Sequence, residues 1–81
     1  MKLDVKLFAQ ARDLAGSERV EVELSDAACV ADLRSALTQR VPQLKQLAPS
    51  LLIALGTEYA DDSMRIEPSA EVACFPPVSG G

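Results

Sequence analysis

The chain has 81 residues, of which 48% are apolar, and its formal net charge is −4. This length favours one domain, and the sequence contains no internal repeat, linker or low-complexity segment. No apolar run approaches the ~18 residues of a membrane span, and the opening segment MKLDVKLFAQ lacks the apolar stretch of a secretory signal. We therefore expect a cytoplasmic protein without a membrane partner.

The charged and metal-binding side chains exclude several classes of function. Twelve acidic residues against eight basic ones would repel a nucleic-acid backbone, so no nucleic-acid partner is expected. The chain has no histidine, and Cys29 and Cys74 are far apart in sequence, so we predict no metal site and no histidine-activated nucleophile. Each cysteine is interpreted as a small buried or capping residue.

Two segments near the start alternate apolar and charged residues, which is typical of β-strands. The positions predicted to face the core are Leu3, Val5 and Leu7 in KLDVKLFA, and Val20, Val22 and Leu24 in RVEVEL. The connection QARDLAGSE, with Gly16 as a turn former, predicts an antiparallel hairpin with an irregular tip.

An amphipathic helix is predicted from residue 30, where the apolar period changes to three and four residues. The stripe consists of Val30, Leu33, Ala36, Leu37 and Val41. Ser25 or Asp26 is the expected cap, and the helix should end near Arg40 because Pro42 disfavours a helical residue before it. The segment QLKQLAP predicts one further helical turn before Pro49.

The second half of the chain predicts further strands. SLLIALG is interpreted as a largely buried strand ended by Gly56, turn signals follow at Asp61-Asp62 and Pro68-Ser69, and EVACF is a last strand. This order predicts an α+β fold in which one main helix packs on one face of a mixed sheet. The first and last strands are expected to lie parallel at its centre.

A family resemblance covers nearly the whole chain. The element order, FAQARDLAG after the first strand and EVACFPPVSGG at the end resemble the small subunits of molybdopterin synthase. PPVSGG directly after a strand is the most specific part. The resemblance implies a ubiquitin-like β-grasp domain over residues 1–75 and an extended functional tail over residues 76–81. Two departures are EPSAE in place of an Asp-Gly-Asp-type turn, and Gly56 where an asparagine is expected.

The tail has the composition of a segment that enters a narrow pocket. Two prolines favour an extended path away from the sheet, and two glycines without Cβ atoms allow the backbone to pass through a narrow channel. The residues expected to insert into a partner are Pro76, Pro77, Val78, Ser79 and Gly80. The carboxylate of Gly81 is then the reactive group.

The resemblance also implies a chemistry and a set of partners. An ATP-dependent, E1-like enzyme would adenylate Gly81, and sulfur from a persulfide donor would replace AMP to leave a thiocarboxylate. The large subunit of the synthase would bind the pyranopterin precursor, receive the tail and form the dithiolene of molybdopterin within a heterotetramer. The chain would bind no cofactor stably and would not be catalytic alone.

A docking face for the large subunit is predicted from Phe8, Arg12, Tyr59 and Phe75. Strand alternation places both phenylalanines opposite the core face, and the chain has only three aromatic residues in all, so exposed ones favour interface anchors. The resemblance favours this interpretation and places Tyr59 there. In the alternative, sheet twist buries both phenylalanines under the loops.

Other functions remain open at this point. One is a sulfur carrier for thiamine synthesis or tRNA thiolation, against which CFPPV argues. Another is a ubiquitin-like modifier joined through Gly81 to lysine amines of target proteins, which nothing in the sequence excludes. The remaining alternative is that the C-terminal SGG is a frayed end with no role in function.

Overall fold

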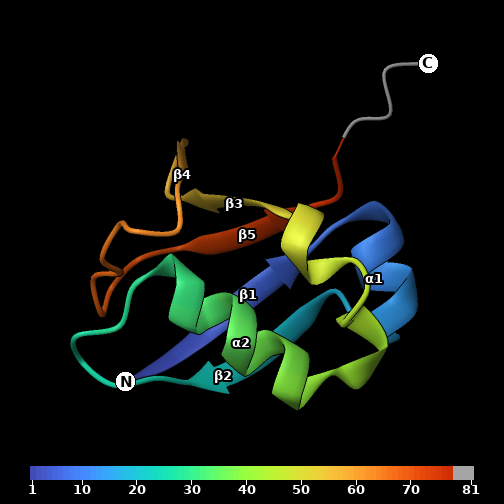
Figure 1. Ribbon diagram of the computed structural model, residues 1–81, viewed down its shortest axis with the longest axis horizontal. Coiled ribbons are helices and arrows are strands. Elements are labelled where there is room, and N and C mark those ends of the chain that lie inside the picture. Colours follow the sequence, from blue (N-terminus) through green and yellow to red (C-terminus); the bar gives the residue numbers. More distant parts are fainter. Residues whose placement is uncertain (78–81) are drawn as a thin grey trace.

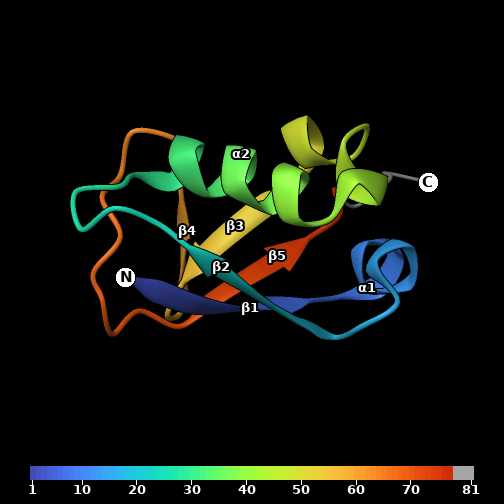
Figure 2. The same cartoon turned by 90° about the horizontal axis from the view of Figure 1, so that it is seen from below.

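The computed structural model describes residues 1–77 and shows a two-layer α+β fold. A five-stranded sheet forms one layer and α2 lies across one of its faces, with α1 at one end (Figures 1 and 2). The elements in chain order are β1 (Lys2–Leu7), α1 (Ala9–Ala15), β2 (Arg19–Glu23), α2 (Val30–Arg40), two 3-10 turns (Pro42–Leu44 and Ala48–Ser50), β3 (Leu52–Leu55), β4 (Glu58–Ala60) and β5 (Val72–Phe75). Within residues 1–77, no helix is long and apolar enough to cross a membrane.

The sheet has the strand order β2-β1-β5-β3-β4. β1 pairs in parallel with β5, and the other three pairs are antiparallel. The prediction that the first and last strands lie side by side at the centre is confirmed, as is the antiparallel pairing of β1 with β2. The last described strand is therefore held between the two halves of the sheet.

The connection between β1 and β2 is not an irregular hairpin tip, so that prediction was wrong. Its residues form α1, whose Ala11 is fully buried against the core. Gly16 ends the helix at φ 72°, and its N–H donates to the carbonyl of Arg12 at 2.9 Å. A left-handed residue that closes the last turn is a common helix ending, and glycine adopts it without a Cβ clash.

The main helix α2 spans the residues that the apolar period predicts. Its buried residues Val30, Leu33 and Leu37 belong to the predicted stripe. The predicted cap at Ser25 or Asp26 was wrong, because the N-cap residue is Cys29. The Cys29 N–H donates to the Asp32 carboxylate at 2.9 Å, which satisfies a backbone donor at the start of the helix. The earlier residues instead form a turn, in which the Ala28 N–H donates to the carbonyl of Ser25.

The hydrophobic core fills the space between the sheet and α2. Alternate residues of β1 and β5 enter it, as the period of the strands requires. Its largest fully buried side chains are Leu7, Leu33, Leu37, Leu44, Leu51, Ile53, Val5, Val30, Val72 and Cys74. No polar or charged residue of the described chain is buried, so the core is closed by apolar packing alone.

Two turns shape the second half of the chain, and the strand β4 that follows the first of them was not predicted from the sequence. β4 is a short strand that pairs with β3 across the two-residue turn Gly56-Thr57, with Gly56 at φ 65°. A positive φ at the first position of such a turn suits glycine. The turn at Pro68-Ser69 is present, and the Ala70 N–H donates to the carbonyl of Glu67 at 2.9 Å. EPSAE thus forms a turn before β5, as expected.

Candidate functional site

The candidate site is an aromatic cluster on the sheet face opposite α2. Phe8 follows β1, Tyr59 lies on β4 and Phe75 ends β5, so three different segments contribute to it. The ring centroids of Phe8 and Phe75 are 4.7 Å apart with an interplanar angle of 10°, and Tyr59 meets Phe75 edge-on with centroids 6.3 Å apart. The structure therefore brings together the three aromatic residues of the predicted docking face.

The cluster presents a large part of its apolar surface to solvent. Phe8 is 39% exposed and Tyr59 is 69% exposed, whereas Phe75 lies half-buried between them. The alternative in which the sheet buries both phenylalanines is thus not what the structure shows. Stacked and edge-on aromatic pairs add about 0.5–1.5 kcal/mol beyond area burial, which holds the rings in one arrangement.

Leu52 belongs to the same surface and was missed from the sequence. It lies directly opposite Phe75 in the β3–β5 register and is 40% exposed. Ala54, opposite Tyr59 on β4, is buried. The segment SLLIALG was interpreted as a largely buried strand, and no exposed residue was singled out in it. Strict alternation would have placed Leu52 on the outer face of the sheet, because its neighbour Ile53 faces the core.

Arg12 lies beside the cluster rather than within it. It lines a hollow of about 220 Å³ together with Phe8, Lys6 and Arg19. Its guanidinium pairs with Asp13 at 3.8 Å on the exposed surface of α1, a contact that contributes little to stability. Three basic side chains and the acidic Glu18 thus border the Phe8 side of the aromatic cluster.

The chain leaves the sheet next to this cluster. Phe75 is the last residue of β5 and Pro76 follows it, half-buried, while Pro77 is exposed. The Phe8 N–H donates to the carbonyl of Cys74 at 3.2 Å, which continues the β1–β5 pairing up to the stacked rings. The predicted tail residues Val78, Ser79, Gly80 and Gly81 lie outside the described residues.

Neither cysteine forms a disulfide, and the two thiols differ in environment. Cys74 points into the core, and burial raises the pKa of its thiol to about 12. Cys29 is half-buried at the start of α2, and its thiol donates to Asp32 at 3.4 Å. Among residues 1–77, no group of three or more cysteine or carboxylate side chains could hold a metal ion.

Two curated relatives align along this whole chain. The molybdopterin synthase sulfur carrier subunit of Chlamydomonas reinhardtii is 34% identical over 83 residues, and the alignment covers 100% of both chains. The protein of the same description from Arabidopsis thaliana is 30% identical, with 100% of this chain and 84% of that protein covered.

Solved structures share the fold. Small archaeal modifier protein 1 from Haloferax volcanii is 30% identical, with complete coverage of both chains and a TM-score of 0.87. A Pyrococcus furiosus protein assigned as subunit 1 of a molybdopterin converting factor is also 30% identical, with 96% and 99% coverage and a TM-score of 0.84. The complex of subunits 1 and 2 of that factor from Helicobacter pylori contains a chain that is 22% identical, with complete coverage of both chains and a TM-score of 0.68. The match to the ThiS family covers residues 5–81, and the chain, a ubiquitin-like β-grasp protein, belongs to that family.

Proposed function

We propose that this protein is the sulfur carrier subunit of a molybdopterin synthase and donates sulfur from a thiocarboxylate at Gly81. The observation that carries the proposal is the position of the aromatic cluster. Phe75 is both its central ring and the last strand residue before Pro76, so a partner that covers the cluster also meets the start of the tail. The full-length relatedness to sulfur carrier subunits supports the same role.

The chemistry uses the carboxylate of Gly81 and groups that the partners supply. A carboxylate is a poor electrophile, so an E1-like enzyme first joins it to AMP from ATP and releases pyrophosphate. The outer sulfur of a persulfide donor attacks the adenylate and displaces AMP, and a second thiol then cleaves the S–S bond of the acyl disulfide, which leaves a thiocarboxylate and a disulfide on the donor side. The thiocarboxylate is a soft nucleophile that attacks the pyranopterin precursor, and water then hydrolyses the acyl–sulfur bond, so the sulfur stays on the precursor and the Gly81 carboxylate is regenerated. Two such transfers complete the dithiolene. The protein is consumed and regenerated as a co-substrate.

The large subunit is the proposed occupant of the aromatic cluster. The solved complex from Helicobacter pylori pairs a subunit of the same fold with its subunit 2, which supports a partner of this class. Exposed aromatic rings in a small apolar patch are typical interface anchors. The tail would then reach the active site of the large subunit, which binds the precursor and supplies the acid–base groups.

Reconstitution tests this function directly. The protein is charged with sulfur by an E1-like enzyme, ATP and a persulfide donor, and then mixed with a large subunit and the pyranopterin precursor. We expect the dithiolene product to appear only with charged protein. If charged protein and large subunit bind each other but form no dithiolene, the assigned role is wrong.

A second candidate is conjugation to proteins, because the small archaeal modifier protein is 30% identical and has the same fold. Its first step would be the same adenylate, but a lysine amine would attack in place of the persulfide. Intact-mass analysis of protein from its native cell separates the two. An oxygen-to-sulfur mass increase at Gly81 supports the carrier, whereas a ladder of larger protein adducts supports the modifier.

A further inference from the structure

The guanidinium of Arg34 joins three segments that are far apart in the sequence. Arg34 lies in the second turn of α2, where its Nε donates to the Asp62 carboxylate at 2.7 Å and its Nη1 donates to the carbonyl of Ala48 at 2.6 Å. The side chain is only 19% exposed. Hydrogen bonds from a charged donor are shorter and stronger than neutral ones, so this guanidinium is held firmly between its two acceptors.

The two acceptors flank the β3–β4 hairpin. Ala48 lies in the 3-10 turn that leads into β3, and Asp62 lies just after β4. The hairpin between them carries Leu52 and Tyr59, which are exposed on the side of the sheet that holds the aromatic cluster. One side chain of α2 therefore holds the chain both where it enters the hairpin and where it leaves.

β4 is a short strand at the edge of the sheet. Among the described strands it pairs with β3 alone, and its register runs from Glu58 to Ala60. Its central residue, Tyr59, is 69% exposed. A strand with a solvated outer edge and few buried apolar contacts opens more readily than a central strand. The position of β4 therefore depends on what binds the ends of the hairpin.

The first turn of α2 binds the same connection through its backbone. The Ala31 N–H donates to the carbonyl of Asp62 at 3.0 Å, and the Val30 N–H donates to the carbonyl of Met64 at 2.9 Å. Amides at the start of a helix have no partner within the helix, and here the segment after β4 supplies the acceptors. Arg34 lies one turn after Val30, on the same flank of α2. Asp62 is thus bound to α2 through its main chain and through its side chain.

The arrangement requires an arginine rather than a positive charge alone. A guanidinium is planar and presents its N–H groups in a fixed fork, whereas the ammonium of lysine is a compact charge on a flexible stem. Two different nitrogens of Arg34 reach acceptors in two different segments. Replacement by lysine keeps the charge but removes the fixed geometry that joins Ala48 to Asp62.

We propose that Arg34 is a positioning residue for docking of the large subunit. From the sheet face opposite the aromatic cluster, it fixes both ends of the β3–β4 hairpin and so holds Tyr59 against Phe75 in the unbound protein. Such preorganisation raises affinity, because less conformational freedom is lost on binding. The proposal rests on the proposed function, in which the large subunit covers the cluster.

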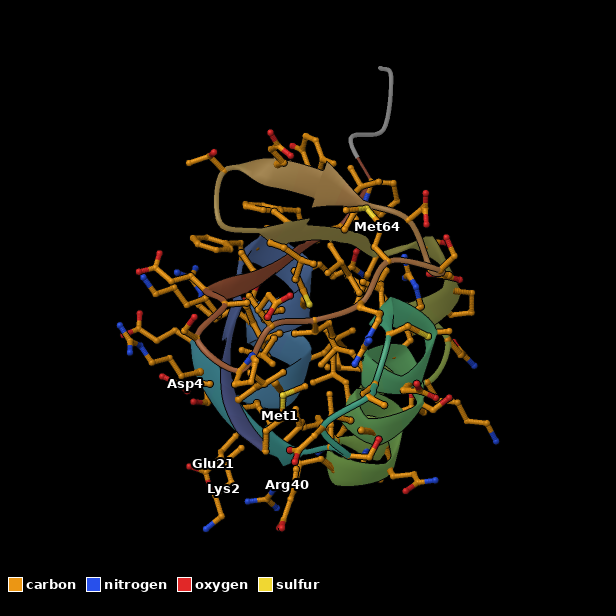
Figure 3. The ribbon with its side chains drawn as sticks, turned by 90° about the vertical axis from the view of Figure 1, so that its left-hand side faces the viewer. Met1, Lys2, Asp4, Glu21, Arg40 and Met64 are labelled. Atoms are coloured by element: carbon orange, nitrogen blue, oxygen red, sulfur yellow. The ribbon has the colours of Figure 1, made fainter. Side chains whose placement is uncertain are left out.

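The first measurement needs no partner. Arg34→Lys should weaken the nuclear Overhauser effect between the Tyr59 and Phe75 rings and should accelerate amide exchange in β4 about tenfold more than in β1. The matched control is Arg40→Lys, because Arg40 lies on the same helix and forms no ion pair within the described chain. Figure 3 shows Arg40 at the lower border of the molecule, far from Met64 and the end of the hairpin. A general contribution to stability would leave the ring contact of the native state unchanged, and that result would overturn the proposal.

The second measurement is the affinity for the large subunit, by titration calorimetry. Arg34→Lys should weaken it about fivefold and Arg40→Lys less than about twofold. Asp62→Ala removes the carboxylate at an exposed position and should also weaken binding, and the double variant should lose less than the sum of the two changes. If Arg34→Lys does not fold, Asp62→Ala decides the question by the same two measurements.

The outcomes separate this proposal from the proposed function. Unchanged affinity of a folded Arg34→Lys variant would overturn the positioning role and leave the docking face in place. Equal losses in Arg34→Lys and Arg40→Lys would reduce the effect to a general change of α2 and would overturn it too. If the unaltered protein does not bind the large subunit, the docking face itself is wrong and the positioning role is overturned with it.

Discussion

Phe75 lies between two aromatic partners, stacked on Phe8 at 4.7 Å and met edge-on by Tyr59 at 6.3 Å. Because an interface anchor of this kind typically contributes at least ~2 kcal/mol, Phe75→Ala should weaken binding to the large subunit about thirtyfold and leave the monomer folded. Titration calorimetry measures the affinity. Met64→Ala removes an exposed apolar side chain outside the cluster and should leave affinity unchanged. Equal effects of both variants would place the docking face elsewhere.

Deletion of Gly81, or addition of one residue after it, should abolish sulfur transfer without changing the unfolding midpoint. The reacting atom must lie within about 3–3.5 Å of its target, so a shift of one residue removes it from reach. Gly80→Val should fold normally and fail in adenylation or transfer. A β-branched side chain restricts the backbone and makes the tail wider than the narrow channel it is expected to enter. Single-turnover transfer assays and thermal unfolding measure the two properties. Full turnover by the extended chain would rule out the thiocarboxylate mechanism.

The two thiols should differ in reactivity. Burial raises the pKa of Cys74 to about 12, and the thiolate is the reactive form, so iodoacetamide at about pH 8 should alkylate Cys29 alone in the native protein. Intact-mass analysis should show one adduct, and two after denaturation. A native adduct at Cys74 would contradict the burial of that side chain.

Protonation of Asp32 should contribute to the loss of folding stability at low pH. The N–H and thiol of Cys29 donate to its carboxylate and lower its pKa below the ordinary value of 3.8. A depressed pKa in the folded state gives stability that is fully present above the unfolded pKa and is lost as the pH falls through the folded pKa. Asp32→Asn should therefore reduce the loss of stability below about pH 4. Urea titrations at several pH values measure the free energy of unfolding. If it depends on pH in Asp32→Asn as it does in the unaltered protein, Asp32 is not the group responsible.

The positive φ angles of Gly16 and Ala9 predict that substitutions at these two positions have opposite effects on the free energy of unfolding. Gly16 has φ 72° with no atom within 4 Å of an added Cβ, so Gly16→Ala should cost about 1–2 kcal/mol from the left-handed backbone alone. Ala9 adopts φ 52°, and Ala9→Gly should stabilise the protein slightly as this strain is relieved. Thermal unfolding compares both variants. A shift of the same sign in both would show that backbone strain is not the cause.

The strands and the helix that bury one face could be predicted from the sequence, because burial of one face imposes a regular spacing on the apolar residues. β1 and β2 alternate strictly and α2 has an apolar stripe, so pattern and structure agree there. The helix α1 was missed because it has seven residues and a single fully buried side chain, Ala11, which gives almost no period. Its signal was local, since Arg12 in the last turn and Gly16 after it are typical of a helix end.

Prediction of the aromatic cluster requires both the periodicity of the strands and the topology of the sheet. Alternation alone placed Phe8 and Phe75 on the outer face, but only the parallel β1–β5 pairing brings two such distant residues into contact. Leu52 was missed because β3 is buried on both sides over part of its length, with Ile53 and Ala54 both buried. The N-cap was assigned to Ser25 or Asp26 because their side chains are the more usual caps, although Cys29 was interpreted as a buried or capping residue and the acidic Asp32 three residues after it is the usual partner of a cap.

The central place of β5 has a consequence for the order of assembly during synthesis. β1 and β3 are each hydrogen-bonded to β5 and not to each other, so a nascent chain without residues 72–75 leaves two strands with open edges. The sheet can therefore close only after the segment that precedes Pro76 has been made. A folded molecule that presents the aromatic cluster is also one whose synthesis has advanced to the base of the tail, which couples recognition by a partner to completion of the chain up to that point.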